Sequence, residues 1–109
     1  HPSSTITAKL VDRTRREGYW GRRRAVEALQ TLGENDRVDE ASVAIADLKE
    51  APDCSQRLSA VKRIRERKAA RALPVLREVA SDGLSNRIHN GCLTDEANRA
   101  IRELKGAAN

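Results

Sequence analysis

RALPVLREVASD, residues 71–82, carries apolar side chains at helical spacing, but a proline stands near its front. In the interior of a helix Pro74 would remove an amide donor, and its ring would collide with the carbonyl four residues earlier. In the first turn of a helix the same residue is tolerated, because the N–H that it lacks has no helical acceptor there. The stretch therefore predicts a turn over residues 68–70 and a new helix that Pro74 opens, rather than one helix from Cys54 to Ala80.

Five further amphipathic segments surround this helix, and turn residues bound them. Gly33 suits the end of the second segment, Pro52 stops the third, and Asp53 followed by Gln56 forms a capping-box variant that opens the fourth. A Gly/Ser/Asn-rich loop over residues 82–93 precedes the last segment and is the part expected to be most mobile. The five predicted helices span Thr5–Arg16, Trp20–Leu32, Val38–Glu50, Cys54–Arg67 and Thr94–Lys105.

The composition agrees with an all-helical chain of one domain, residues 1–109. Hydrophobic residues make up 39% of it, mostly small aliphatic ones, with one Trp, one Tyr and no Phe or Met. Closely packed helices suit such side chains, and nothing in the pattern argues for a sheet. The chain starts at His1 rather than Met, so we expect it to be a piece of a longer protein.

The two cysteines leave two interpretations open. Cys54 and Cys92 are able to form a single disulfide, but helical cores often bury a lone thiol, and no Cys-dense framework is present. No apolar run is long enough to cross a bilayer and no signal peptide is visible. Together these features favour a cytoplasmic location.

The apolar residues repeat along the chain. Ala25, Ala60 and Ala97 open matching triplets in alternate helices and are separated by 35 and 37 residues, while Ala41 and Ala72 in the other helices are separated by 31. Periods of this length are typical of helix-pair solenoids.

Two segments carry a resemblance to a known repeat. ALPVLREVASD, residues 72–82, resembles the first helix of a bacterial short-form HEAT-like repeat, and RRRAVEALQTLG, residues 22–33, resembles the second helix. The resemblance implies an α-solenoid of about three helix pairs. The sequence departs from the pattern at the long loop of the third repeat and at Arg67, where an apolar residue is expected.

A second resemblance concerns context. VDEASVAIADLKEAPDCSQRLSAVKRIR, residues 38–65, together with NGCL, residues 90–93, is similar to helical tails appended to bacterial eukaryotic-like serine/threonine protein kinases. It implies a kinase-associated regulatory or substrate-docking role. The chain itself holds none of the kinase catalytic motifs.

Basic residues form a stripe on the predicted second helices. Positions two and five after the alanines at 60 and 97 are Lys62, Arg65, Arg99 and Arg102, and in HEAT-like solenoids the second helices line the concave side. A stripe of this kind predicts a docking surface for an acidic or phosphorylated protein segment. The ordinary alternative is a solvated face with i, i+4 ion pairs such as Lys62 with Glu66.

An aromatic pair precedes the second helix. Tyr19 or Trp20 is expected to pack at the turn between helices, since the two rings are the largest apolar surfaces available. The alternative is that Trp20 anchors a partner.

Nucleic acid is the alternative partner. The net charge is +5, the pI is near 9.8, and Arg22 to Arg24 stand near a helix start where phosphates bind well. Against this interpretation, 16 acidic residues are interspersed with the basic ones, and no aromatic residues line the stripe for base stacking. We therefore favour a protein–protein interaction or scaffold module.

Enzymatic and metal chemistry are not expected. His1 and His89 are the only histidines, and no acid, base or nucleophile pair is apparent. Cys54, His89 and Cys92 lack the paired spacing of a structural zinc site. The sequence thus predicts no catalytic residue, no metal and no cofactor.

Overall fold

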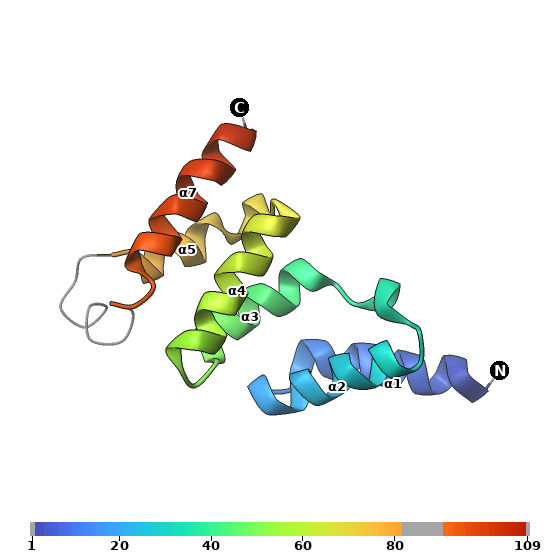
Figure 1. Cartoon of the computed structure of the whole chain (residues 1–109). Coiled ribbons are helices and arrows are strands. Elements are labelled where there is room, and N and C mark those ends of the chain that lie inside the picture. The colour runs from blue at the N-terminus through green and yellow to red at the C-terminus, as the bar shows by residue number, and fades with distance from the viewer. Residues whose placement is uncertain (1, 82–90, 109) are drawn as a thin grey trace.

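A computed structural model describes residues 2–81 and 91–108 of the chain, and every regular element in these ranges is a helix. The prediction of an all-α protein is therefore confirmed. Two short 3-10 turns, η1 (Asn35–Arg37) and η2 (Ala70–Ala72), accompany the α-helices (Figure 1). The helices are α1 (Pro2–Arg16), α2 (Tyr19–Thr31), α3 (Glu40–Glu50), α4 (Cys54–Arg67), α5 (Leu73–Val79) and α7 (Thr94–Ala108).

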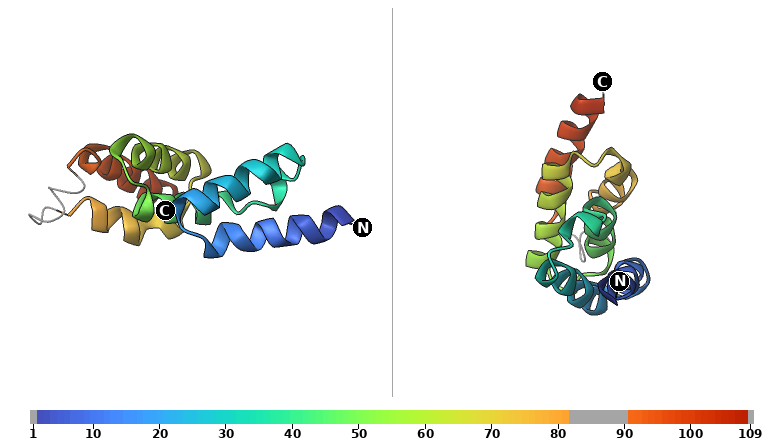
Figure 2. Two further views of the ribbon diagram at one scale, coloured as in Figure 1. Left: turned by 90° about the horizontal axis from the view of Figure 1, so that it is seen from below. Right: turned by 90° about the vertical axis from the view of Figure 1, so that its right-hand side faces the viewer.

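Consecutive helices pack in pairs. The most extensive contacts join α1 with α2, α3 with α4, and α5 with α7, and smaller contacts join α2 to α3 and α4 to α7. The pairs follow one another along a molecule of 50 × 32 × 18 Å (Figure 2). Its radius of gyration is 15.0 Å, against about 13 Å for a compact domain of this length, so the pairs form an elongated stack.

The chain breaks between α4 and α5 where Pro74 predicts. α4 ends at Arg67, and Lys68 takes a left-handed conformation with φ 51°. The backbone N–H of Ala69 then donates to the carbonyl of Ile64 at 3.1 Å, which satisfies one of the last helical acceptors. Pro74 stands in the first turn of α5. The predicted turn over residues 68–70 is confirmed.

Local capping signals are largely confirmed as well. Gly33 ends α2 with φ 74°, and the Asp53 carboxylate accepts from the Gln56 N–H at 2.9 Å to open α4. The start of α3 differs from the prediction, because Val38 is extended and buried and Asp39 caps a helix that begins at Glu40.

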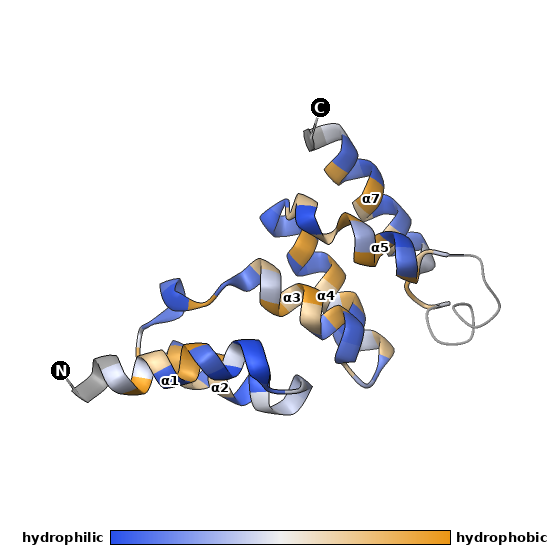
Figure 3. Ribbon diagram, turned by 180° about the vertical axis from the view of Figure 1, so that it is seen from behind, coloured by the Kyte–Doolittle hydropathy of each residue, from blue (hydrophilic) through white to orange (hydrophobic). Residues whose placement is uncertain are grey.

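The main core lies between the last two helix pairs. Small aliphatic side chains from α3, α4, α5 and α7 interlock there, and orange segments mark these apolar faces in Figure 3. The fourteen buried members are Ala44, Leu48, Ala60, Val61, Ile64, Ala69, Ala72, Val75, Leu76, Val79, Leu93, Ala97, Ala100 and Leu104.

A much smaller core joins the N-terminal pair to the segment that follows it. Its buried members are Val26 and Leu29 of α2, Val38 before α3 and Val43 of α3, with Leu10 and Val11 of α1 packed against them. α1 closes this end of the stack and has neighbours on one side only, so its outer face stays in solvent.

Two apolar side chains at this end of the stack are exposed. Ile6 and Leu32 follow the helical spacing of the apolar residues but are 52% and 47% exposed. Thr7 and Thr14 are buried instead, and the Thr14 hydroxyl donates to the carbonyl of Val11 at 2.6 Å. α1 is thus rotated so that a row containing two threonines faces its neighbours.

The two cysteines are exposed and joined to each other. A disulfide links Cys54, the first residue of α4, to Cys92, just before α7, with Cα atoms 6.3 Å apart. The interpretation of a thiol buried in the core is therefore wrong. His89 and most of the predicted loop over residues 82–93 lie outside the described residues.

None of the helices in the described ranges combines the length and apolar character needed to cross a membrane.

Candidate functional site

A groove between α4 and α7 brings together three of the four residues of the predicted basic stripe. Its volume is about 560 Å³, and we call it the α4/α7 groove. Arg102 is absent from its walls and stays exposed one turn further along α7. The lining residues are Ser55, Leu58, Ser59, Lys62, Arg65, Glu96 and Arg99.

Intramolecular ion pairs occupy much of this stripe. Arg65 donates two hydrogen bonds to Glu103, at 2.9 and 2.8 Å, and a third to Glu96 at 3.0 Å. Hydrogen bonding between the two side chains raises the pKa of Arg65 and lowers the pKa of Glu103. Arg99 also lies 3.3 Å from Glu96. The arginines of the groove are therefore partly neutralised by α7 itself.

Lys62 stays available. The predicted ion pair of Lys62 with Glu66 is not formed, and Lys62 has no ion-pair partner in the part of the chain that the structure describes. Among the predicted residues, Lys62 and Arg102 offer the least engaged positive charges.

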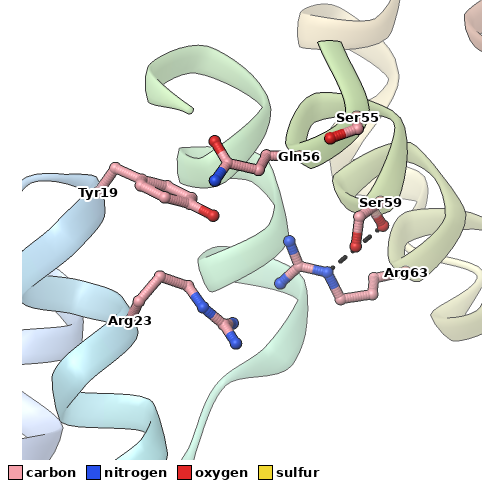
Figure 4. A pocket seen from close by; sticks show the side chains of 6 residues that line it. All are labelled: Tyr19, Arg23, Ser55, Gln56, Ser59 and Arg63. Atoms are coloured by element: carbon pink, nitrogen blue, oxygen red, sulfur yellow. Dashed lines mark hydrogen bonds between the residues drawn. The ribbon is translucent and has the colours of Figure 1, made fainter. Parts of the chain in front are cut away.

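A second groove, of about 280 Å³, separates α4 from α2 (Figure 4). The Arg23 and Arg63 guanidinium groups and the Tyr19 hydroxyl point into the same space, as the close-up shows. We call it the α2/α4 groove. Its six lining residues, none of them acidic, are Tyr19, Arg23, Ser55, Gln56, Ser59 and Arg63.

A buried ion cluster stands behind the α2/α4 groove. Arg22, only 1% exposed, donates from Nε to the buried carboxylate of Asp47 at 2.8 Å. Arg63 donates to the other oxygen of Asp47, also at 2.8 Å. The cluster therefore ties α2, α3 and α4 together, and Glu50 lies at its rim, 3.4 Å from Arg22.

This cluster corrects the suggestion that Arg22 contacts phosphate. Arg22 is buried, and its Nη1 atom donates to the carbonyl of Glu17 at 3.0 Å. Sequence reasoning missed Asp47 because charged residues were taken as solvated. The available signal was the position of Asp47 between apolar neighbours, Val43, Ala44 and Leu48, on the buried face of α3.

Of the two aromatic residues, Tyr19 packs within the fold and Trp20 is exposed. Tyr19 is half-buried and lines the α2/α4 groove. Trp20 is 61% exposed and meets the Tyr19 ring edge-on, with centroids 5.0 Å apart. Trp20 thus places a large exposed apolar surface next to the groove.

The two grooves share one helix. Ser55 and Ser59 of α4 line both, so α2, α4 and α7 present one corrugated surface. This is the set of second helices on which the sequence predicts a binding face.

In the described ranges, no three His, Cys, Asp or Glu side chains gather in a way that would hold a metal ion. The disulfide occupies the sulfur atoms of Cys54 and Cys92. His89, the third residue considered as a ligand, lies outside those ranges.

Comparison with known proteins returns no matching family model, no matching curated protein and no matching solved structure. The HEAT-like and kinase-tail resemblances therefore stay predictions.

Proposed function

We propose that the chain is a HEAT-like helical-repeat module, a small α-solenoid that binds an acidic segment of a protein partner on its α2, α4 and α7 surface. The supporting observation is the α4/α7 groove, which Lys62, Arg65 and Arg99 line together with the apolar residue Leu58. Apolar area supplies affinity, and charge supplies orientation and rate of encounter.

The residues of the groove have different tasks in this proposal. Lys62 and Arg99 reach the partner's carboxylates, while Glu96 and Glu103 hold Arg65 in a fixed orientation. Leu58 and the methylene stems of the basic residues pack against apolar partner atoms. Trp20, exposed at the edge of the neighbouring groove, is a second anchor point.

Mixed charge favours protein over nucleic acid as the partner. Glu96 and Glu103 stand within the basic stripe and would repel a continuous phosphate backbone. Burial of Arg22 also removes one of the three arginines considered for phosphate contacts. A nucleic-acid-binding repeat would show binding that falls steeply with salt.

The cellular context remains a prediction. The kinase-tail resemblance indicates a regulatory or substrate-docking role, and the composition indicates the cytoplasm. The exposed Cys54–Cys92 disulfide weighs toward an oxidising compartment instead, because reducing compartments keep such thiols free. Mass spectrometry after alkylation of the protein, purified from cells without reductant, would show whether both thiols are blocked.

The binding proposal is tested with a fluorescent oligoglutamate peptide that contains one leucine, measured by anisotropy. The double variant Lys62→Glu/Arg99→Glu should weaken binding by about tenfold or more, because two attractions become repulsions. The matched control, Lys49→Glu/Arg67→Glu, carries the same charge change at exposed positions outside both grooves and should change binding by about twofold or less.

Equal weakening in both double variants would contradict the proposal, because it would show that net charge alone attracts the peptide. A duplex DNA that binds more tightly than the peptide, with the same dependence on Lys62 and Arg99, would favour the nucleic-acid alternative.

A further inference from the structure

The α2/α4 groove concentrates positive charge without an acidic lining residue. We propose that this groove binds the phosphate of a phosphoserine or phosphothreonine within the partner's acidic segment. This inference rests on the proposed function, because it assigns one chemical group of the same peptide to one place on the same surface.

Two arginines supply the charge. Arg23 has no hydrogen-bond or ion-pair partner in the described part of the chain, so no contact there competes with a ligand for its donors. Arg63 is held by Asp47 through Nη2 and still keeps 24% of its side chain exposed. A guanidinium that is already oriented loses less conformational freedom when it binds phosphate.

Neutral donors complete the groove. The Tyr19 hydroxyl points into the same space as the two guanidinium groups (Figure 4), and Ser59 and Gln56 line the wall formed by α4, the helix that also carries Arg63. A phosphate monoester presents three acceptor oxygens. The groove offers charged donors from two helices and neutral donors beside them, which suits such a group better than a single carboxylate.

The start of α2 adds to the positive potential of the groove. Behind the groove, Asp47 and Glu50 balance the charges of Arg22 and Arg63, and the Nη2 atom of Arg22 is buried without an acceptor. Tyr19 also begins α2, whose N-cap residue Gly18 provides no side-chain cap. The first N–H groups of α2 therefore add their partial positive charge to that of the arginines.

The neighbouring groove indicates that the phosphate belongs to a peptide. The α4/α7 groove shares Ser55 and Ser59 with this site, and it offers apolar Leu58 together with the carboxylate of Glu96. A nucleic acid would place further phosphates near Glu96, whereas a peptide with one phosphate can place an apolar residue on Leu58. The arrangement fits one phosphorylated residue followed or preceded by an apolar one.

The experiment compares three peptides of one acidic sequence, with serine, phosphoserine or glutamate at a single position, by isothermal titration calorimetry. Phosphoserine should bind about tenfold more tightly than serine, and more tightly than glutamate. Arg23→Gln should remove most of this gain, and Tyr19→Phe should reduce it by about twofold to fivefold.

The matched control is Arg24→Gln. Arg24 is the next residue on α2, has the same charge and faces the hollow between α1 and α2 instead of the α2/α4 groove. It should keep the full gain from phosphorylation. Arg63 is left unchanged because it also neutralises buried Asp47.

Four results would overturn the inference. Equal binding of the serine and phosphoserine peptides shows that the groove does not recognise phosphate, and an equal loss in Arg23→Gln and Arg24→Gln shows that only net charge matters. Inorganic phosphate that binds as tightly as the phosphopeptide, or a DNA oligonucleotide that displaces it with the same dependence on Arg23, shows that the ligand is not a peptide.

Binding of the serine peptide tests the proposed function, recognition of an acidic segment, separately from recognition of phosphate. In the proposal, the serine peptide depends on Lys62 and Arg99 and not on Arg23. Loss of the phosphate gain while the serine peptide still binds overturns only the inference drawn from the α2/α4 groove.

Discussion

The two ends of the molecule are stabilised in different ways. The helices α3, α4, α5 and α7 share a core of fourteen buried apolar residues and carry the Cys54–Cys92 disulfide. The α1–α2 pair shares a core of only four buried apolar members with Val38 and Val43 of the segment that follows it. Arg22, Asp47 and Arg63 add a buried ion cluster that joins α2 to α3 and α4.

Where buried apolar surface is scarce, a buried ion cluster adds to the apolar contacts that hold neighbouring helices together. Removing apolar area from water stabilises a packed interface without any demand on orientation. A buried ion pair is different, because it tolerates neither the loss of a partner nor a large change in geometry. We therefore expect the N-terminal junction to be the more fragile and the C-terminal part to be the more tolerant of substitution.

The largest effect is expected at Asp47. Asp47→Ala leaves the buried Arg22 with only the rim carboxylate of Glu50, 3.4 Å away, and this loss costs about 3–5 kcal/mol of unfolding free energy. Urea denaturation measures the loss. Hydrogen exchange should show that α1 and α2 lose protection before α5 and α7 do.

Two further variants serve as controls for this prediction. Asp36→Ala removes an exposed carboxylate from η1 and should change stability by no more than about 0.5 kcal/mol. If Asp47→Ala prevents folding altogether, Asp47→Asn keeps the shape and one acceptor and should be intermediate. A cost of less than about 1 kcal/mol for Asp47→Ala would show that the junction does not depend on the ion cluster.

The next effect concerns the disulfide at the other end. Cys54 and Cys92 are separated by 38 residues, and opening a loop of this size is expected to cost about 2–4 kcal/mol. Dithiothreitol should lower the unfolding free energy of the wild-type chain by this amount. The Cys54→Ser/Cys92→Ser variant should have a lower unfolding free energy than the oxidised wild type, and dithiothreitol should not change it. Equal stability of the oxidised and reduced wild-type chain would contradict the prediction.

A smaller effect is expected at the cap of α3. The Asp39 carboxylate accepts from the N–H and hydroxyl of Ser42 and pairs with Arg71 of η2. Partial burial alone would raise the pKa of Asp39, but these contacts outweigh it and hold the pKa below 3.8. Asp39→Ala should cost about 1 kcal/mol at pH 7.

The pH dependence follows from the direction of that shift. A carboxyl group with a lowered pKa stabilises the folded state fully above its unfolded-state pKa of 3.8, and this contribution is lost as the pH falls through the lower folded-state value. The difference between wild type and Asp39→Ala should therefore shrink below pH 4. A difference that stays constant from pH 7 to about pH 2 would show that the carboxylate charge has no part in the cap.

The smallest effect is a gain in stability. Lys68 has a φ of 51°, a region in which side chains are strained and glycine is not. Lys68→Gly should therefore raise the unfolding free energy by about 0.5–1 kcal/mol. Lys62→Gly, within α4, should lower it by about as much, and a loss in both variants would show that Lys68 makes a compensating contact.

The elements that the sequence predicted well depend on neighbours in the chain. Pro74 opens α5, Gly33 ends α2 and Asp53 caps α4, because each acts through its own backbone or a residue within one turn. Apolar periodicity likewise located the buried faces of α4 and α7. One half of the predicted capping box is not formed, because the Gln56 Oε1 atom is buried without a partner.

The candidate site was predicted only in part, because it depends on residues that are far apart in the chain. Lys62, Arg65 and Arg99 do share a groove, since their spacing places them on the exposed faces of α4 and α7. The α2/α4 groove was not expected, because Arg23 and Arg63 come from different pairs and nothing in either segment relates them. Neither the neutralisation of Arg65 by Glu103 nor the burial of Arg22 has a local signal.

By itself the sequence determined the helices, several of their ends and the positive charge of the chain, because hydrogen bonding within a turn and apolar spacing are local properties. Only the tertiary structure decided which charges are available to a partner. Packing brings Asp47 against Arg22 and Arg63, and Glu103 against Arg65, and it leaves Arg23 and Lys62 unpaired within the described ranges. A charge interacts with whatever lies within a few ångströms of it, and those neighbours come from helices far apart in the chain.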